Sequence, residues 1–249
     1  MRIYAVTFDL WDTLIKEVPG GSDKVADLRI ARVMDALASR GLVHTREELV
    51  AAYAHTGRFL ELTWSKRRDM GIKDQVLFLL TCIDAKLPGR LSREGFEEIV
   101  EIYSDCILDS PPVLLPGAKE ALEAVKLRGC RIGLICNTGR TPGTTLRKLL
   151  ERMGILWYFD VTTFSNEILV RKPAEAAFRT TLDRLGALPK VEVHIGDNPD
   201  NDIDGAKRVG MMAFHVTAYA EGEAPKADAR METLEGLALA LDKFQQQAL

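Results

Sequence analysis

The sequence is poor in the features that mark several common classes of protein. Its four cysteines lie far apart and form no CxxC pair, and none lies beside a histidine at the spacing of a zinc site. This distribution excludes a disulfide framework and a zinc module, and reduced thiols predict a cytoplasmic protein. No apolar run approaches the length of a membrane-spanning helix. Asp9 and Asp12 follow the first methionine too closely for a signal peptide.

The chain also lacks an excess of basic charge. The chain carries 33 Lys and Arg residues against 36 Asp and Glu residues, so it lacks the positive balance typical of a nucleic-acid-binding protein. The longest basic run, residues 66–68, is too short to change that conclusion. A hydrophobic share of 47% is that of an ordinary globular chain, and 249 residues suffice to bury a large core. We therefore expect the protein to bind a small-molecule substrate, and neither nucleic acid nor a membrane. We expect it to be a monomer or a homodimer.

Hydrophobic periodicity divides the chain into three parts. A short apolar strand at residues 3–8 ends at Asp9, and a helical pattern without any strand candidate then runs from 23 to 109. After a Pro-rich linker at 110–117, short apolar strands alternate with helices. We expect strands at 131–136, 161–164, 191–195 and 212–216, and helices at 144–153, 174–185 and 201–209.

This alternation predicts an α/β fold with a doubly wound, Rossmann-like parallel sheet. The first strand belongs to that sheet, so the helical block is an inserted cap domain. We place the core at residues 1–15 and 113–249 and the all-helical cap at 16–112. Within the cap, Thr45 and Glu48 have the spacing of a capping box at the start of a helix. An insertion directly after the first strand predicts a lid over a site at the carboxyl ends of the strands.

Polar residues follow each of the predicted core strands up to residue 202. Asp9 follows the first strand, residues 136–138 (Cys-Asn-Thr) end another, and 165–167 (Ser-Asn-Glu) end a third, shortly before 171–173 (Arg-Lys-Pro). The fourth ends in 196–202 (GDNPDND). Each of these patterns by itself is typical of a turn or a helix cap. Because the carboxyl ends of parallel strands share one edge of the sheet, together they predict a single site.

Four of these motifs give the chain its resemblance to the haloacid dehalogenase superfamily, whose members are mostly phosphohydrolases. Residues 8–14 (FDLWDTL) resemble the nucleophile loop of that family, and 134–138 (LICNT) resemble its second motif. Residues 171–173 resemble its lysine motif, and 196–202 resemble its acidic motif. All four occur in the family's order. The resemblance covers the core, whereas the cap matches only as a helical insertion at the expected place.

The resemblance implies a role for each motif residue. Asp9 would attack phosphorus and form an aspartyl-phosphate. Mg²⁺ would be held by Asp9, the main-chain carbonyl of Trp11 and Asp197, with Asp202 beside the metal or next to its ligands. Lys172 would bind the phosphoryl oxygens and offset the charge of the nucleophile. The residues of the second motif that would hold the other phosphoryl oxygens are Cys136, Asn137 and Thr138.

Trp11 departs from the family pattern. Family phosphatases usually carry a second aspartate there, which protonates the leaving group and later activates water, and such help is worth about 10²–10⁴-fold in rate. Asp12 lies next to that position, but a shift of one residue redirects a side chain in a tight turn. Haloacid dehalogenases and phosphonate hydrolases of the superfamily also lack this aspartate. Phosphonate hydrolases form a Schiff base with a cap lysine, for which Lys66 is the candidate.

The acidic motif favours a phosphatase over these two alternatives. Haloacid dehalogenases need no metal and replace the leading acid of this motif by a neutral residue, whereas this chain keeps Asp197 and Asp202. With Asp9 they would place three carboxylates together, and such a cluster requires a cation. We therefore predict a Mg²⁺-dependent phosphohydrolase for a small phosphorylated metabolite, able to act without the usual acid where the leaving group is good.

Cys136 is a second departure, because the family has serine or threonine there and a thiol is a weak hydrogen-bond donor. Thr138 or main-chain N–H groups could take its place. Together with Trp11 it motivates a third interpretation, a non-catalytic binding protein on a decayed enzyme core, against which the retained motif residues argue. In the cap, the candidates for recognising the substrate are Trp64, Lys66, Arg67, Arg68 and Arg58.

Overall fold

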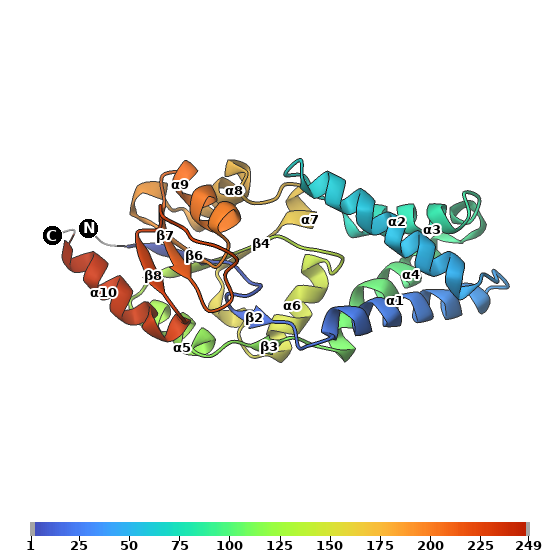
Figure 1. Ribbon diagram of the computed structural model, residues 1–249, viewed down its shortest axis with the longest axis horizontal. Helices are drawn as coiled ribbons and strands as arrows, with labels where there is room; N and C mark the ends of the chain where they lie inside the picture. Colours follow the sequence, from blue (N-terminus) through green and yellow to red (C-terminus); the bar gives the residue numbers. More distant parts are fainter. Residues whose placement is uncertain (1–2, 248–249) are drawn as a thin grey trace.

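The centre of the protein is a six-stranded, fully parallel sheet in the order β5-β4-β1-β6-β7-β8 (Figure 1). The computed structural model describes residues 3–247, with side chains as far as Phe244. The predicted α/β fold is confirmed. Two predicted strands begin two residues late. The first begins at Ala5 and not at residue 3, and another begins at Val193, because Pro189–Val191 forms a 3₁₀ turn (η4). The strands are β1 (Ala5–Phe8), β4 (Arg131–Cys136), β5 (Val161–Phe164), β6 (Val193–Gly196), β7 (Met212–Val216) and β8 (Ala229–Met231).

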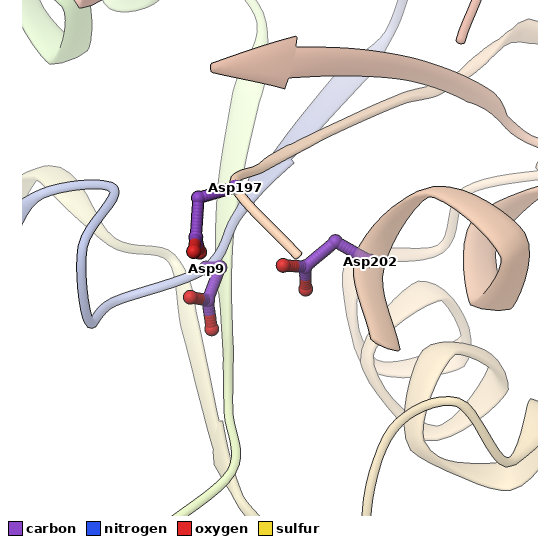
Figure 2. Close-up of side chains that lie close together, drawn as sticks. All are labelled: Asp9, Asp197 and Asp202. Atoms are coloured by element: carbon purple, nitrogen blue, oxygen red, sulfur yellow. The ribbon is translucent and has the colours of Figure 1, made fainter. Parts of the chain in front are cut away.

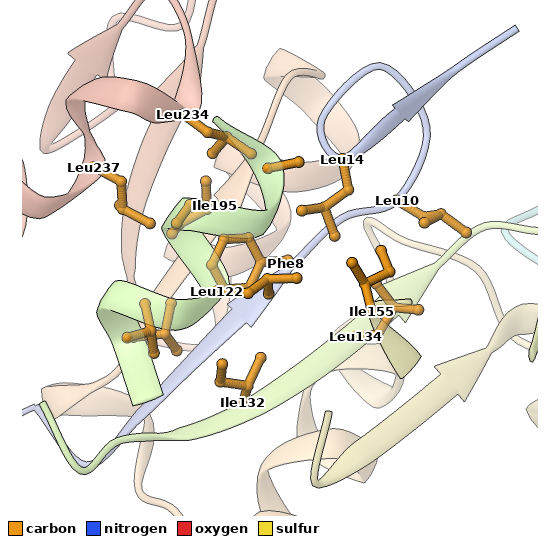
Figure 3. Close-up of a cluster of buried hydrophobic side chains, with 14 of the residues drawn as sticks. Phe8, Leu10, Leu14, Leu122, Ile132, Leu134, Ile155, Ile195, Leu234 and Leu237 are labelled. Atoms are coloured by element: carbon orange, nitrogen blue, oxygen red, sulfur yellow. The ribbon is translucent and has the colours of Figure 1, made fainter. Parts of the chain in front are cut away.

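Helices cover both faces of this sheet (Figure 1). One face buries Phe8 and Ile195 under α5, which contributes Leu122, and under α10 (Figure 3). The other buries Ala5 and Ile135 under α8, which contributes Phe178, and under α9. Burial on both faces explains why the strands read as apolar runs and not as alternating patterns. The core helices are α5 (Ala118–Leu127), α6 (Gly143–Arg152), α7 (Ser165–Ile168), α8 (Glu175–Leu185), α9 (Gly205–Arg208) and α10 (Leu237–Gln247), with 3₁₀ turns η3 (Leu156–Tyr158) and η6 (Leu234–Gly236).

Four further helices form a lobe of their own at residues 21–109, which we call the helical lobe (Figure 1). It has a separate buried cluster that includes Val33, Leu80 and Tyr103. The predicted capping box is present: the Glu48 N–H donates to Thr45 Oγ1 at 3.2 Å, and the Thr45 N–H donates to Glu48 Oε2 at 2.9 Å. The lobe comprises α1 (Gly21–Ala38), α2 (Arg46–Trp64), α3 (Ile72–Ile83), η1 (Pro88–Arg90), α4 (Arg93–Asp105) and η2 (Cys106–Asp109).

Main-chain hydrogen bonds join the helical lobe to the rest of the described chain at two places. The two chain segments that enter and leave it pair as short antiparallel strands, β2 (Ile15–Lys16) and β3 (Val113–Leu114). At the second place the turn after α2 pairs with the turn after α7. There the Asp69 N–H donates to Leu169 O at 3.1 Å, and the Arg171 N–H donates to Arg67 O at 3.1 Å. The domain limits drawn from the sequence stay a prediction.

Some elements carry little signal in the sequence. The strands β2 and β3 have two residues each, too few for a periodicity. The predicted helix at 201–209 starts as a π-helix, η5 (Pro199–Asp204), and continues as the four-residue α9. Within residues 3–247, no helix is both long and apolar enough to cross a membrane.

Candidate active site

Three aspartates meet at the carboxyl edge of the sheet (Figure 2). Asp9 follows β1, Asp197 follows β6, and Asp202 lies in η5. One carboxylate oxygen from each lies within 4.8 Å of the others. Gly196 allows this approach, because a Cβ at that position would lie 2.3 Å from Asp202 Cγ. The motifs predicted to converge are therefore adjacent.

Lys172 lies between two of these carboxylates. Its Nζ contacts Asp9 Oδ1 and donates to Asp202 Oδ1 at 2.6 Å, and its side chain is almost fully buried. Asn137 fixes the main chain of this lysine, since Asn137 Nδ2 donates to Lys172 O at 3.0 Å and the Lys172 N–H donates to Asn137 Oδ1 at 2.8 Å. Asn137 thus positions the lysine, a contact that its motif did not indicate.

Burial and like charge set the electrostatics of the cluster. Burial raises the pKa of Asp9 to about 7, against the lowering effect of the Lys172 ammonium. Burial, with Asp9 and Asp202 nearby, raises the pKa of Asp197 to about 8. For Asp202 burial acts in the same direction, but Lys172 and His194 outweigh it and hold the pKa below the usual range. Two of the three carboxylates therefore lack sufficient compensating charge.

Asp202 has partners on both oxygens. Besides Lys172, its Oδ1 contacts His194 Nε2 at 3.2 Å, and its Oδ2 accepts from the Asn198 N–H at 2.9 Å. His194 is buried in β6 and packs edge-on against Phe178, as expected for a structural histidine. These contacts suit Asp202 to orienting the lysine more than to direct metal ligation.

Asp9 and Asp197 are better suited to hold a cation. Asp197 Oδ1 accepts one hydrogen bond, from Thr13 Oγ1 at 3.3 Å, and among the described side chains only Lys172 forms a hydrogen bond with Asp9. Three carboxylates against one ammonium leave net negative charge, and oxygen donors of this kind suit Mg²⁺. The residues present therefore fit the divalent cation expected from the sequence.

The loop after β1 turns Asp12 toward Lys16. Asp12 has a left-handed backbone (φ 55°), and its N–H donates to Ile15 O at 2.7 Å. Its carboxylate lies 3.3 Å from Lys16 Nζ in an exposed ion pair. Trp11 is half-buried and packs against lobe residues that include Val25 and Ile107. This pairing with Lys16 does not support Asp12 as the general acid of the site.

The side chains of Cys136 and Thr138, both of the second motif, lie in different environments. The Cys136 thiol is buried, and burial together with Asp9 raises its pKa far above the usual range, so it is an inert thiol. Thr138 Oγ1 donates to Asp69 Oδ2 at 3.1 Å, and the Thr138 N–H donates to Ser165 Oγ at 2.7 Å. The Thr138 hydroxyl is therefore engaged with the helical lobe.

Asp69 joins the lobe to the sheet side, and no motif marks it in the sequence, where it is simply the acid after the basic run 66–68. Its carboxylate is fully buried and receives hydrogen bonds from Trp64 Nε1 at 3.0 Å and from Arg171 Nη1 at 2.9 Å. Ser165 Oγ donates to the same carboxylate, and the Arg171 guanidinium lies 4.5 Å from the Trp64 ring centre. Trp64, a candidate for recognising the substrate, thus also has a structural contact.

A cavity of about 480 Å³ lies between the helical lobe and the sheet edge. Trp11 and Asn137 border it from the sheet side, and Tyr53 and Trp64 border it from the lobe. The other candidate cap residues are exposed and do not line this cavity: Arg58, Lys66, Arg67 and Arg68.

Comparisons with known proteins agree with this architecture. A family model described as haloacid dehalogenase-like hydrolase matches residues 3–210. Curated relatives include the phosphoglycolate phosphatases of Yersinia pseudotuberculosis and Escherichia coli K12. They are 29% and 26% identical to this chain over 228 and 234 residues, which is 89% of this chain and 84% of each relative.

Solved structures show the same fold. A 2-haloacid dehalogenase from Pseudomonas syringae pv. Tomato has a TM-score of 0.70 at 22% identity, covering 97% of this chain and 99% of that one. A phosphatase from Thermococcus onnurineus has a TM-score of 0.62 at 25% identity, covering 96% and 98%.

Proposed function

The chain belongs to the haloacid dehalogenase-like hydrolase family, and from this premise we propose that it is a Mg²⁺-dependent phosphohydrolase for a small phosphorylated metabolite. The observation that carries the proposal is the cluster of Asp9, Asp197 and Asp202 around the buried Lys172. An excess of carboxylates suits a metal-assisted reaction at phosphorus. A dehalogenase needs no such excess, because its halide leaves without a cation.

The cation would be held by Asp9, Asp197 and the main-chain carbonyl of Trp11, with Asp202 holding Lys172 in place. Bound Mg²⁺ would supply positive charge that offsets the charge of the phosphoryl group. Residues 16–112 would act as a cap on the core formed by 1–15 and 113–249.

Asp9 would attack phosphorus, forming a carboxylate–phosphorus bond as the bond to the leaving oxygen breaks. Lys172 would offset charge on the nucleophile and on the phosphoryl oxygens. Water would then attack phosphorus, release inorganic phosphate and regenerate Asp9. Of the predicted phosphate-binding side chains, Asn137 holds Lys172 and Thr138 holds Asp69, which leaves Lys172 as the principal phosphoryl-binding group.

The leaving oxygen has no protein acid at position 11. The reaction therefore favours phosphate esters whose leaving group is stable as an anion. A less stable leaving group would have to take its proton from water. Because the two curated relatives are named phosphoglycolate phosphatases, phosphoglycolate is the first metabolite to test. The role of a phosphonate hydrolase is less well supported, since Lys66 is exposed and does not border the cavity.

Hydrolysis of p-nitrophenyl phosphate with Mg²⁺ and with EDTA tests the proposal. We expect turnover only with Mg²⁺, and a loss to background in Asp9→Asn. Asp12→Asn is the matched control in the same loop and should retain turnover, because Asp12 pairs with Lys16. Chloride release from 2-chloropropionate that persists in EDTA would contradict the proposal and favour a dehalogenase.

A further inference from the structure

The cavity contains a buried guanidinium that no acid neutralises. Arg29, on α1, is 5% exposed and borders the cavity. Its three hydrogen bonds go to uncharged groups: Tyr103 O at 3.0 Å, Thr141 Oγ1 at 2.7 Å and Tyr53 Oη at 3.4 Å. No carboxylate of the described residues lies within 4.0 Å of it. A buried charge without a counter-charge is costly and calls for an anion.

A second arginine approaches the same place from the sheet side. Arg140, in the loop between β4 and α6, also borders the cavity. Its Nη1 donates to Tyr103 Oη at 3.0 Å, and its Nη2 donates to Tyr53 O at 2.8 Å. The guanidinium lies 3.7 Å from the Tyr53 ring centre, and among the described residues it too forms no ion pair. Arg29 and Arg140 thus share two tyrosines and lack an acid.

The acids that border the cavity do not fill this need. Glu17 and Asp23 are exposed, and Glu17 accepts a hydrogen bond from Ser22 Oγ at 3.0 Å. The third arginine at the cavity, Arg171, is already paired with Asp69. The uncompensated charge is therefore confined to Arg29 and Arg140, the first from the helical lobe and the second from the sheet side.

We infer that Arg29 and Arg140 form a subsite for a second anionic group of the substrate, a carboxylate at the end remote from the phosphate. The inference rests on the proposed function for the phosphoryl end of the ligand. Guanidinium groups match a planar carboxylate with paired hydrogen bonds, which suits them to this role. Since the two arginines come from opposite sides of the cavity, a carboxylate between them also holds the helical lobe against the sheet.

Gly57 provides a way to disturb this subsite without changing its charge. It lies on α2, and a Cβ there would be 2.6 Å from Arg140 Nη2. Gly57→Ala must therefore displace the Arg140 guanidinium, while alanine itself favours the helix. The variants for the test are Arg29→Met, Arg140→Met and Gly57→Ala. The control is Arg90→Met, which removes an exposed arginine of η1.

Calorimetric titration with Mg²⁺ present measures the subsite directly. Phosphonoacetate, 3-phosphonopropionate and 4-phosphonobutyrate are compared with methyl-, ethyl- and propylphosphonate, which lack the carboxylate. For at least one length we expect the carboxylate to tighten binding to the unmodified protein by about 10–100-fold, the worth of hydrogen bonds to a charged group. That gain should fall several-fold in Arg140→Met, Arg29→Met and Gly57→Ala, and persist in Arg90→Met.

No gain at any length, or a gain that persists in Arg140→Met and Gly57→Ala, would overturn the inference. Circular dichroism melting identifies any variant that fails to fold. If Arg29→Met fails to fold, Gly57→Ala still tests the subsite, because it keeps both arginines. Because these phosphonates are not phosphate esters, the titration requires no turnover. A carboxylate gain without p-nitrophenyl phosphate hydrolysis would refute the proposed function alone, and hydrolysis without a gain would refute the subsite alone.

Discussion

By the resemblance of residues 8–14 to the family's nucleophile loop, Trp11 takes the position at which we expect an acid for the leaving group. Its half-buried indole packs against Val25 and Ile107 of the helical lobe and borders the cavity. The neighbouring Asp12 is bound to Lys16. The side chain at position 11 therefore contributes to lobe packing and offers no proton, so in the proposed reaction we expect the rate to depend on the leaving group.

Replacing Trp11 by aspartate should restore part of the missing proton transfer. We expect Trp11→Asp to raise the rate on alkyl phosphates, relative to p-nitrophenyl phosphate, by about 10²-fold, the lower end of general-acid catalysis. The lost indole packing should cost about 1–3 kcal/mol of unfolding free energy, less than for a fully buried tryptophan. Steady-state rates on ethyl phosphate and p-nitrophenyl phosphate give the ratio.

Trp11→Asn is the matched control for that substitution, because it loses the same packing and cannot give a proton. An equal ratio of the rates on ethyl phosphate and p-nitrophenyl phosphate in Trp11→Asp and Trp11→Asn would show that the aspartate does not reach the leaving oxygen.

Among the elements, the turn after α2 has the largest share of polar contacts between the helical lobe and the sheet. Asp69 carries them, with Arg171, Ser165 and Thr138 as partners from the sheet side. At the other attachment, β2 and β3 form only a two-residue pairing. Movement of the lobe about β2 and β3 therefore requires the Asp69 contacts to break, together with the side-chain contacts that Arg29, Arg140 and Asp105 make between lobe and core.

Asp69→Ala should release the lobe at this second attachment. It leaves the largely buried Arg171 guanidinium without its partner, so we expect a loss of about 3 kcal/mol in unfolding free energy, as for a broken buried ion pair. Urea denaturation measures this loss. Amide hydrogen exchange at residues 67–71 and 169–171 should become faster.

Asp27→Ala, which breaks the exposed pair with Arg46, should cost less than about 1 kcal/mol. Similar losses in both variants, with unchanged exchange at 67–71, would mean that Asp69 does not fasten the lobe.

The sequence predicted what depends on local pattern and left out what depends on pairing across long distances. Apolar runs at 131–136 and 161–164 match β4 and β5, and the Thr45 capping box is formed by neighbouring residues. The convergence of Asp9, Asp197 and Asp202 followed from parallel-strand topology. Asp69 could not be found in this way, because its partners on the sheet side lie 69 or more positions away and no spacing rule relates them.

Across the protein, charge is distributed unevenly around the cavity. Negative charge gathers at Asp9 and Asp197, and uncompensated positive charge gathers at Arg29 and Arg140. A ligand with a phosphoryl group, its cation and a carboxylate would neutralise both regions. Stability should therefore depend on what is bound, because each region lacks its counter-charge when the ligand is absent.

Mg²⁺ should raise the melting temperature through the aspartate cluster. At a concentration of about 100 times the dissociation constant, a ligand stabilises the folded state by about 2.7 kcal/mol, which corresponds to roughly 5–10 °C for a chain of this size. In Asp197→Asn we expect most of that rise to vanish. In EDTA the same variant should melt above the unmodified protein, because one of three crowded carboxylates is gone. Differential scanning calorimetry should thus show that the variant has the higher melting temperature in EDTA and the unmodified protein has the higher one in Mg²⁺.

Asp204→Asn is the control for this prediction. It alters a nearby acid paired with Lys226 and should keep the full Mg²⁺ effect. An equal Mg²⁺ rise in Asp197→Asn would place the cation outside this cluster.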